Sequence, residues 1–125
     1  MSLYIKKILV SLNILSLIII YVVKRRFIEF KALISNEVIF FYSSRFTPNE
    51  LVKYSIFWLN IFKISSCFTR SLVIRDMLIM GGFRPKIEIG VSLKDKGFES
   101  HCWVKLDDFY TEEKMIRDKF KIINN

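Results

Sequence analysis

The segment 65–108 constrains the fold most, because it contains a helix signal followed by two strand signals. Ser65 or Ser66 can cap a helix that begins at Cys67, and the paired glycines at 81–82 are a usual stop signal. The sequence therefore predicts a helix with a cysteine in its first turn. The unpaired N–H groups and the dipole at such a position favour a thiolate over a thiol.

Two alternating runs follow this helix. Residues 86–93 alternate between apolar and polar or small side chains, and the polar turn KDKG occupies 94–97. The second run places Cys102, Val104 and Leu106 on one face and His101, Trp103 and Lys105 on the other. Both runs have the period of half-buried strands, so the sequence predicts an antiparallel hairpin.

The register of this hairpin brings the candidate site together. If Leu93 pairs with Phe98, Gly90 lies opposite His101, and the apolar faces of the two strands agree. We expect the preceding helix to cross the His101 face near Gly90 and to bring Cys67 beside the imidazole. A cysteine within hydrogen-bond reach of a histidine is the minimal nucleophile and base pair for acyl transfer. Cys102 points away from His101 by strand alternation, so it is assigned to the core.

These motifs resemble a known family. The cysteine at a helix start, RDML at 75–78, GFRPK at 82–86 and GFESHCWV at 97–104 are similar to the transglutaminase-like cysteine proteases of lasso-peptide biosynthesis. The resemblance covers residues 60–123. It implies a protein that removes the leader from a ribosomally made precursor peptide, so that an ATP-dependent cyclase can close the macrolactam ring.

The third catalytic residue departs from the family pattern, in which it is usually an aspartate on the strand after the histidine. The position at matching distance is Glu113, which the resemblance favours, and its neighbour Glu112 is the competitor. A two-residue turn at Asp107 and Asp108 puts Glu112 on the face of His101, whereas a turn one residue longer puts Glu113 there. Geometry alone does not choose. The expected triad is Cys67, His101 and Glu113.

The N-terminal region is the most apolar part of the chain. Residues 8–23 lie between Lys6 and Lys7 on one side and the basic residues 24–26 on the other, without a signal-peptide cleavage site. As a helix the run spans roughly 24 Å, short of a membrane core of roughly 30 Å. It fits a buried or interfacial helix as well as a marginal membrane span or anchor.

The region after this run has a weaker signal and then a strong one. Residues 27–46 indicate one helix broken near Ser35 and Asn36, or a helix followed by a short strand. Thr47 then opens a capping box and predicts a helix over 48–62 with an apolar face suited to the core. The C-terminal residues 114–125 indicate a short helix or strand and a tail.

Composition limits the partners. The 125 residues fit one compact unit, and a net charge of +8 favours acidic peptides, anionic lipid or nucleic acid. No nucleic-acid motif accompanies the charge, and a single histidine with two cysteines provides neither a zinc cluster nor a disulfide framework. We therefore expect no nucleic acid, no metal, no cofactor and a reducing compartment.

The expected fold is α+β and papain- or transglutaminase-like. An apolar helical region over 1–46 joins a cysteine protease core over 47–125, and the N-terminal helices cover the sheet face opposite the catalytic helix. The expected function is leader removal in the cytoplasm or at the inner face of the membrane, with a separate leader-recognition protein and the cyclase as partners. A non-catalytic scaffold that binds the precursor or the membrane is the alternative.

Overall fold

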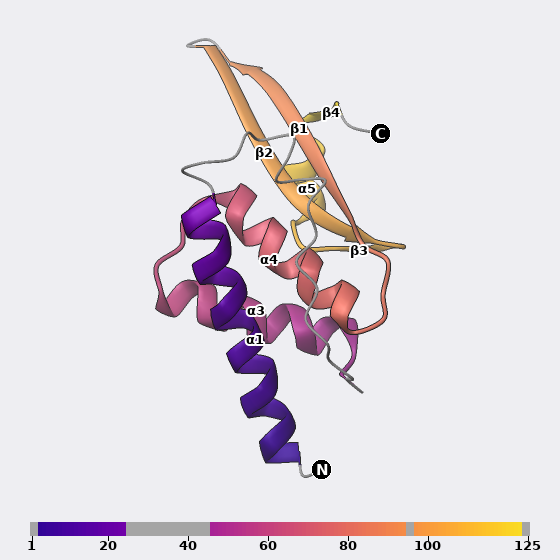
Figure 1. Ribbon diagram of the computed structural model, residues 1–125. Coiled ribbons are helices and arrows are strands. Elements are labelled where there is room, and N and C mark those ends of the chain that lie inside the picture. Colours follow the sequence, from indigo (N-terminus) through magenta and orange to yellow (C-terminus); the bar gives the residue numbers. More distant parts are fainter. Residues whose placement is uncertain (1–2, 25–45, 95–96, 124–125) are drawn as a thin grey trace.

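The computed structural model describes residues 3–24, 46–94 and 97–123. The described helices are α1 (Leu3–Lys24), α3 (Pro48–Ile61), α4 (Cys67–Met80) and α5 (Lys114–Arg117). The described strands are β1 (Lys86–Lys94), β2 (Gly97–Leu106), β3 (Phe109–Tyr110) and β4 (Lys121–Ile122). The strands form one antiparallel sheet in the order β3-β2-β1-β4 (Figure 1). The α+β class is confirmed. The prediction for 27–46 lies outside the described residues except at its last position.

The helix signals act as the sequence predicts. Thr47 closes a capping box with Glu50 at the start of α3, and the Ser66 hydroxyl accepts a bond from the Thr69 amide at the start of α4. At the other end of α4, Gly82 adopts a φ of 91°, and the following amide bonds back to the Leu78 carbonyl at 3.0 Å. This Schellman-type end needs a residue that tolerates positive φ, which explains the glycine.

The hairpin has the predicted register. Gly90 pairs with His101, Ile89 with Cys102 and Leu93 with Phe98. The apolar face of both strands is therefore shared, and Ile87, Ile89, Cys102, Val104 and Leu106 are all buried in the core. The alternation was sufficient to set the register because a slip of one residue would expose this whole face.

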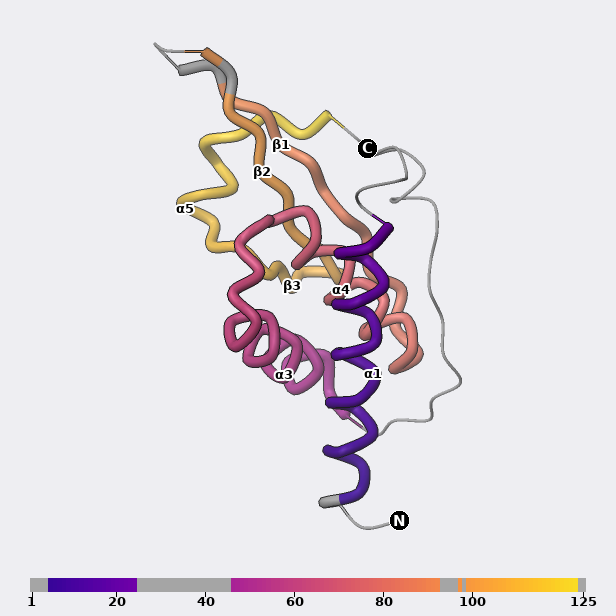
Figure 2. Tube along the Cα trace, turned by 60° about the vertical axis from the view of Figure 1, so that its left-hand side comes forward, coloured from indigo at the N-terminus to yellow at the C-terminus, as the bar shows by residue number. Residues whose placement is uncertain are grey.

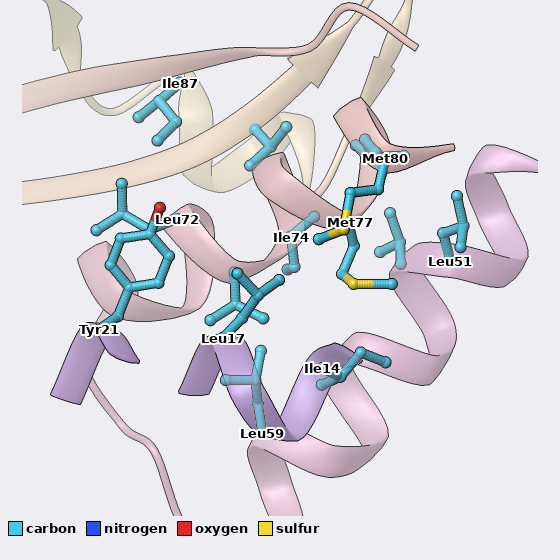
Figure 3. Close-up of a cluster of buried hydrophobic side chains, with 14 of the residues drawn as sticks. Ile14, Leu17, Tyr21, Leu51, Leu59, Leu72, Ile74, Met77, Met80 and Ile87 are labelled. Atoms are coloured by element: carbon cyan, nitrogen blue, oxygen red, sulfur yellow. The ribbon is translucent and has the colours of Figure 1, made fainter. Parts of the chain in front are cut away.

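Helix α4 lies at the centre of the molecule. It packs against β1 and β2 on one side and against α1 and α3 on the other (Figures 1 and 2). Almost every residue from Phe68 to Met80 is buried, which is the pattern of a helix covered all round. Side chains from the sheet and from α1, α3 and α4 meet in one cluster, including Tyr21, Leu51, Leu72, Met77 and Ile87 (Figure 3).

The predicted layering is wrong in one respect. The N-terminal helices pack behind α4 instead of covering the other face of the sheet. That other face contacts the C-terminal segment, where Phe120 lies 5.6 Å from the His101 ring and 6.2 Å from the Trp103 ring, centroid to centroid. A single helix that is apolar all round can bury two layers at once, so α1 and α3 need no sheet face of their own.

A buried polar cluster joins α1 to α4. Arg75 donates to the Asp76 carboxylate at 3.0 Å and to the Tyr21 hydroxyl at 3.2 Å, and Tyr21 also donates to Asp76. Asp76 is fully buried and Arg75 is 4% exposed. Burial of these charges is tolerable only because they are paired and hydrogen-bonded. Tyr21 takes part in this pairing, so its hydroxyl fixes the position of α1 against α4.

One face of α1 remains apolar and exposed. The segment Ile5–Lys24 is long and apolar enough to cross a membrane, and its most apolar 18 residues have a mean hydropathy of 2.0. Of these residues, 28% are buried in the fold. The buried side chains, among them Ile14 and Leu17, face α3 and α4. The opposite side carries Leu12 at 54% and Ile19 at 64% exposure. The helix is thus neither fully buried nor free of the fold.

Candidate active site

Cys67 is the first residue of α4 and lines a cavity of about 330 Å³ at the end of that helix. The cavity is shared by α3, α4, β2 and the segment after β3, and its walls include Arg70, His101, Trp103 and Glu112. Cys67 is half-buried, so a substrate reaching this cavity meets the sulfur directly. Cys67 begins a helix, as the sequence predicts, and His101 lines the same cavity.

The route by which Cys67 reaches His101 differs from the expectation. Helix α4 packs on the face of β2 that carries Cys102, where the Ser71 hydroxyl donates to the Cys102 sulfur at 3.7 Å. The His101 side chain points to the other face. The described residues of β3 pair with β2 only at Lys105 and Leu106, so no strand covers the edge of β2 beside His101. Cys67 and His101 approach each other at this uncovered edge.

The backbone of β2 also faces this open edge. The Ile89 carbonyl accepts a bond from the Ile123 amide at 3.0 Å, so Ile89 directs its backbone groups away from β2. Ile89 and its partner Cys102 therefore form a pair without mutual hydrogen bonds, and the backbone groups of Cys102 point to the opposite side of the hairpin. On this side the Cys102 amide helps to lower the pKa of the Cys67 thiol.

The acidic partner of His101 is Glu112. The imidazole Nε2 lies 2.6 Å from a carboxylate oxygen of Glu112, and the two side chains are 28% and 23% exposed. An ionised carboxylate only accepts hydrogen bonds, so Nε2 carries the proton in this pair and Nδ1 remains for the sulfur. The second Glu112 oxygen accepts a bond from the Glu113 amide at 3.1 Å, which fixes the carboxylate plane.

The expectation for Glu113 is corrected by the length of the turn. Leu106 pairs with Phe109, so only Asp107 and Asp108 lie between them, and Asp107 takes a φ of 52°. This is the two-residue turn that directs Glu112 to the face of His101. Glu113 is instead the exposed N-cap residue of α5, and its side chain makes no capping hydrogen bond. The family position favoured Glu113, but the face of a strand residue follows from turn length.

The environment of Cys67 favours its thiolate. The pKa of the Cys67 thiol is lowered to about 5, chiefly by a hydrogen bond from the Cys102 side chain, whose sulfur is 3.4 Å away. Partial burial opposes this shift, while the Cys102 amide and the charge and hydrogen bond of His101 add to it. The same contact and its own burial raise the pKa of Cys102. One sulfur is therefore the anion and the other the donor.

Cys102 is the functional neighbour that the sequence did not predict. Its burial agrees with the core assignment, at 6% exposure, but its sulfur also contacts Cys67. Strand alternation indicates only that Cys102 faces away from His101. The contact follows from the placement of the first turn of α4 over that face, and no local signal contains this information.

Aromatic side chains pack against the His101 ring. Phe120 stacks on the His101 ring with centroids 5.6 Å apart, and Trp103 donates from its indole nitrogen to Glu88 at 3.0 Å. Gly90 makes room for this packing, because a Cβ there would lie 2.5 Å from the Phe120 Cβ. In the described ranges, no cluster of three or more His, Cys, Asp or Glu residues is placed to hold a metal ion.

Comparison with known protein families agrees with this geometry. The model of the transglutaminase-like superfamily matches residues 53–125, which is more than half of the chain and includes Cys67, His101 and Glu112. The chain belongs to the transglutaminase-like superfamily. Neither a curated protein nor a solved structure matches it. The matched part begins inside α3, so α1 lies outside the superfamily match. Cysteine peptidases and transglutaminases share this domain type, which supports a cysteine-protease type of function.

Proposed function

We propose that this protein is a cysteine peptidase that removes the leader from a ribosomally made lasso-peptide precursor before an ATP-dependent cyclase closes the macrolactam. The observation that carries a peptidase role is the meeting of Cys67, His101 and Glu112 in one cavity, with Nε2 of the imidazole held 2.6 Å from the carboxylate. The lasso-peptide substrate rests on the sequence resemblance at 75–78, 82–86 and 97–104.

The proposed mechanism begins with the Cys67 thiolate. Its sulfur attacks the scissile carbonyl carbon, and the backbone amide of Cys67, in the first turn of α4, is placed to donate to the developing oxyanion. The imidazolium of His101 then gives its Nδ1 proton to the leaving amine, which leaves an acyl-enzyme. Water attacks the thioester carbonyl while His101 removes its proton, and the free thiolate returns. Glu112 holds the ring and offsets its positive charge.

The test uses the purified protein and the precursor peptide encoded beside its gene, with and without the neighbouring gene products. We expect leader cleavage, measured by mass spectrometry, and a loss of roughly 10⁴-fold or more in Cys67→Ala. A separate leader-recognition protein should increase cleavage, because the cavity at Cys67 is small and gives little grip on a long leader. Full cleavage by Cys67→Ala would contradict the peptidase assignment.

A membrane-associated position in the cytoplasm is the second part of the proposal. The exposed apolar face of α1 continues through Trp58, which lines the same apolar hollow as Ile8 and Leu12 and donates to Ser11 at 3.1 Å. Phe57 and Phe62 extend it, at 55% and 52% exposure. Contiguous apolar and aromatic side chains with lysines nearby are suited to the interface of an anionic bilayer.

Fractionation of cells with a carbonate wash tests this position. A peripheral contact through the apolar face predicts that the wild-type protein sediments with membranes before the wash and that carbonate releases it. Leu12→Glu or Ile19→Glu should be soluble already before the wash, and both variants should keep the wild-type melting temperature because these side chains are exposed. Recovery of the wild-type protein in the soluble fraction before the wash would remove the membrane from the proposal. Retention of both variants in the membrane pellet would argue for another means of attachment.

A further inference from the structure

The two cysteines of the chain lie side by side, although they are 35 positions apart. The Cys67 and Cys102 sulfurs are 3.4 Å apart, and the Ser71 hydroxyl donates to the Cys102 sulfur from the other side at 3.7 Å. A peptidase of the proposed type uses one sulfur. A buried position on β2 can be filled by any small apolar residue, so packing alone does not call for a second thiol beside the nucleophile.

The surroundings of the two sulfurs differ in a way that sets an order of reaction. Both cysteines line the cavity, but Cys67 is only half-buried, whereas Cys102 is 6% exposed. A dissolved oxidant therefore meets Cys67 first. Thiolate character and access are the two properties that make a cysteine sensitive to oxidation, and a second thiol within reach converts the first oxidation product into a disulfide.

We propose that Cys102 is a resolving thiol that forms a reversible disulfide with Cys67 after Cys67 is oxidised by a hydroperoxide. This modification rests on the reactive Cys67 of the proposed function but not on cleavage of any peptide. It protects the nucleophile from irreversible oxidation and blocks acyl transfer until a dithiol reductant restores it. The modification is specific to this chain's pair of cysteines and needs no second protein.

The Cys67 thiolate attacks the peroxide, forms a sulfur–oxygen bond and breaks the oxygen–oxygen bond, and the leaving alkoxide or hydroxide takes a proton from solvent. The Cys102 thiol loses its proton to solvent as its sulfur attacks the sulfenic acid, and the expelled hydroxide becomes water. Two thiols and one hydroperoxide thus give one disulfide, one alcohol or water molecule, and one water. A dithiol reverses the bond and becomes a cyclic disulfide.

The two sulfurs already lie close together, and the bond needs a short further approach. Closure must bring the sulfurs from 3.4 Å to a covalent length of about 2.05 Å. Cys67 lies at the first position of α4, next to the N-cap Ser66, so a small shift at this end of the helix is sufficient. Cys102 itself sits in the paired part of β2 and stays in place.

The experiment oxidises the reduced full-length protein with hydrogen peroxide, alkylates the remaining thiols with N-ethylmaleimide and measures the intact mass. We expect a species that has lost two hydrogen masses and carries no maleimide, and that regains two reactive thiols after dithiothreitol. Cys102→Ala should form a sulfenic acid at Cys67 that dimedone traps, and roughly tenfold more sulfinic acid than the wild-type protein at the same peroxide dose. Cys102→Ser retains the size of the side chain and should behave in the same way, which controls for a packing defect.

Matched variants separate this inference from the proposed function. Cys67→Ala should resist oxidation at the dose that converts the wild-type protein. The mass readout needs no substrate, so the disulfide can form even if leader cleavage is absent, and cleavage can be present even if the disulfide does not form. Two maleimide adducts on peroxide-treated wild-type protein, or equal sulfinic acid in the wild type, Cys102→Ala and Cys102→Ser, would overturn the proposal.

Discussion

The two faces of β2 differ in what holds them, although the same alternation produced both. Cys102, Val104 and Leu106 enter the main core under α4, where burial and close packing set their positions. His101 and Trp103 face the C-terminal segment, where Phe120 and Glu112 contact the His101 ring. Trp103 also donates a hydrogen bond to Glu88 of the neighbouring strand β1. The first face supports the fold, and the second face orients an imidazole.

The candidate site belongs to neither face alone. Cys67 comes from the core side and His101 from the other side, and they meet where β2 has an open edge. This arrangement separates the side chains that stabilise the fold from those that orient the His101 imidazole. Substitutions on one face should therefore change mainly stability, and substitutions on the other should change mainly turnover.

Among these substitutions, the largest effect on turnover is expected at Glu112, on the His101 face. Glu112→Gln removes the charge that offsets the imidazolium and should lower kcat for leader cleavage by roughly 10²- to 10⁴-fold with little change in melting temperature. Glu113→Gln is the matched control, because its carboxylate is exposed and makes no capping bond. Steady-state kinetics of both variants decides between them. If Glu113→Gln lost the activity and Glu112→Gln retained it, the geometric assignment would fail.

The core face should show the reverse behaviour. Val104 is fully buried, so Val104→Ala leaves a cavity beneath α4 and should lower the free energy of unfolding by about 2 kcal/mol. Turnover of the remaining folded protein should stay within about threefold, because Val104 does not line the cavity that contains Cys67 and His101. Urea denaturation and cleavage kinetics on the same sample measure both quantities. A large loss of kcat without a loss of stability would show that the two faces are not separable.

The smallest effect concerns the pH at which Cys67 becomes reactive. Only the thiolate reacts with iodoacetamide, so the labelling rate should rise with pH through an inflection near the Cys67 pKa of about 5 and level off above it. Cys102→Ala removes the largest cause of the lowered pKa, so its inflection should move upward toward the ordinary thiol value. Peptide mapping should find the label on Cys67. Preferential labelling of Cys102 would contradict the assignment of the anion to Cys67.

Much of the scaffold around the site was predictable because it depends on local signals. Ser66 caps α4, the glycine at position 82 ends it, and the alternation over 86–106 sets the pairing of Gly90 with His101. Each of these follows from a backbone requirement that a few neighbouring residues satisfy. The α+β class and the approach of Cys67 to His101 could be predicted on this basis.

The remaining features depend on where whole elements lie. The layering of α1 and α3 behind α4 depends on how much apolar surface each helix can cover, and the sequence pattern of α4 is compatible with either arrangement. The choice of Glu112 depends on a turn that differs by one residue between two acceptable forms.

By itself, the sequence determined the caps, the strand register and the candidate pair of one cysteine at a helix start with one histidine on a strand. Only the tertiary structure decided that α4 rests on the Cys102 face, that the site opens at the edge of β2 and that the Cys102 sulfur lies 3.4 Å from Cys67. The physical reason is that alternation specifies to which side of a sheet a residue points, whereas contacts across that sheet depend on the helix that the global burial of apolar surface places there.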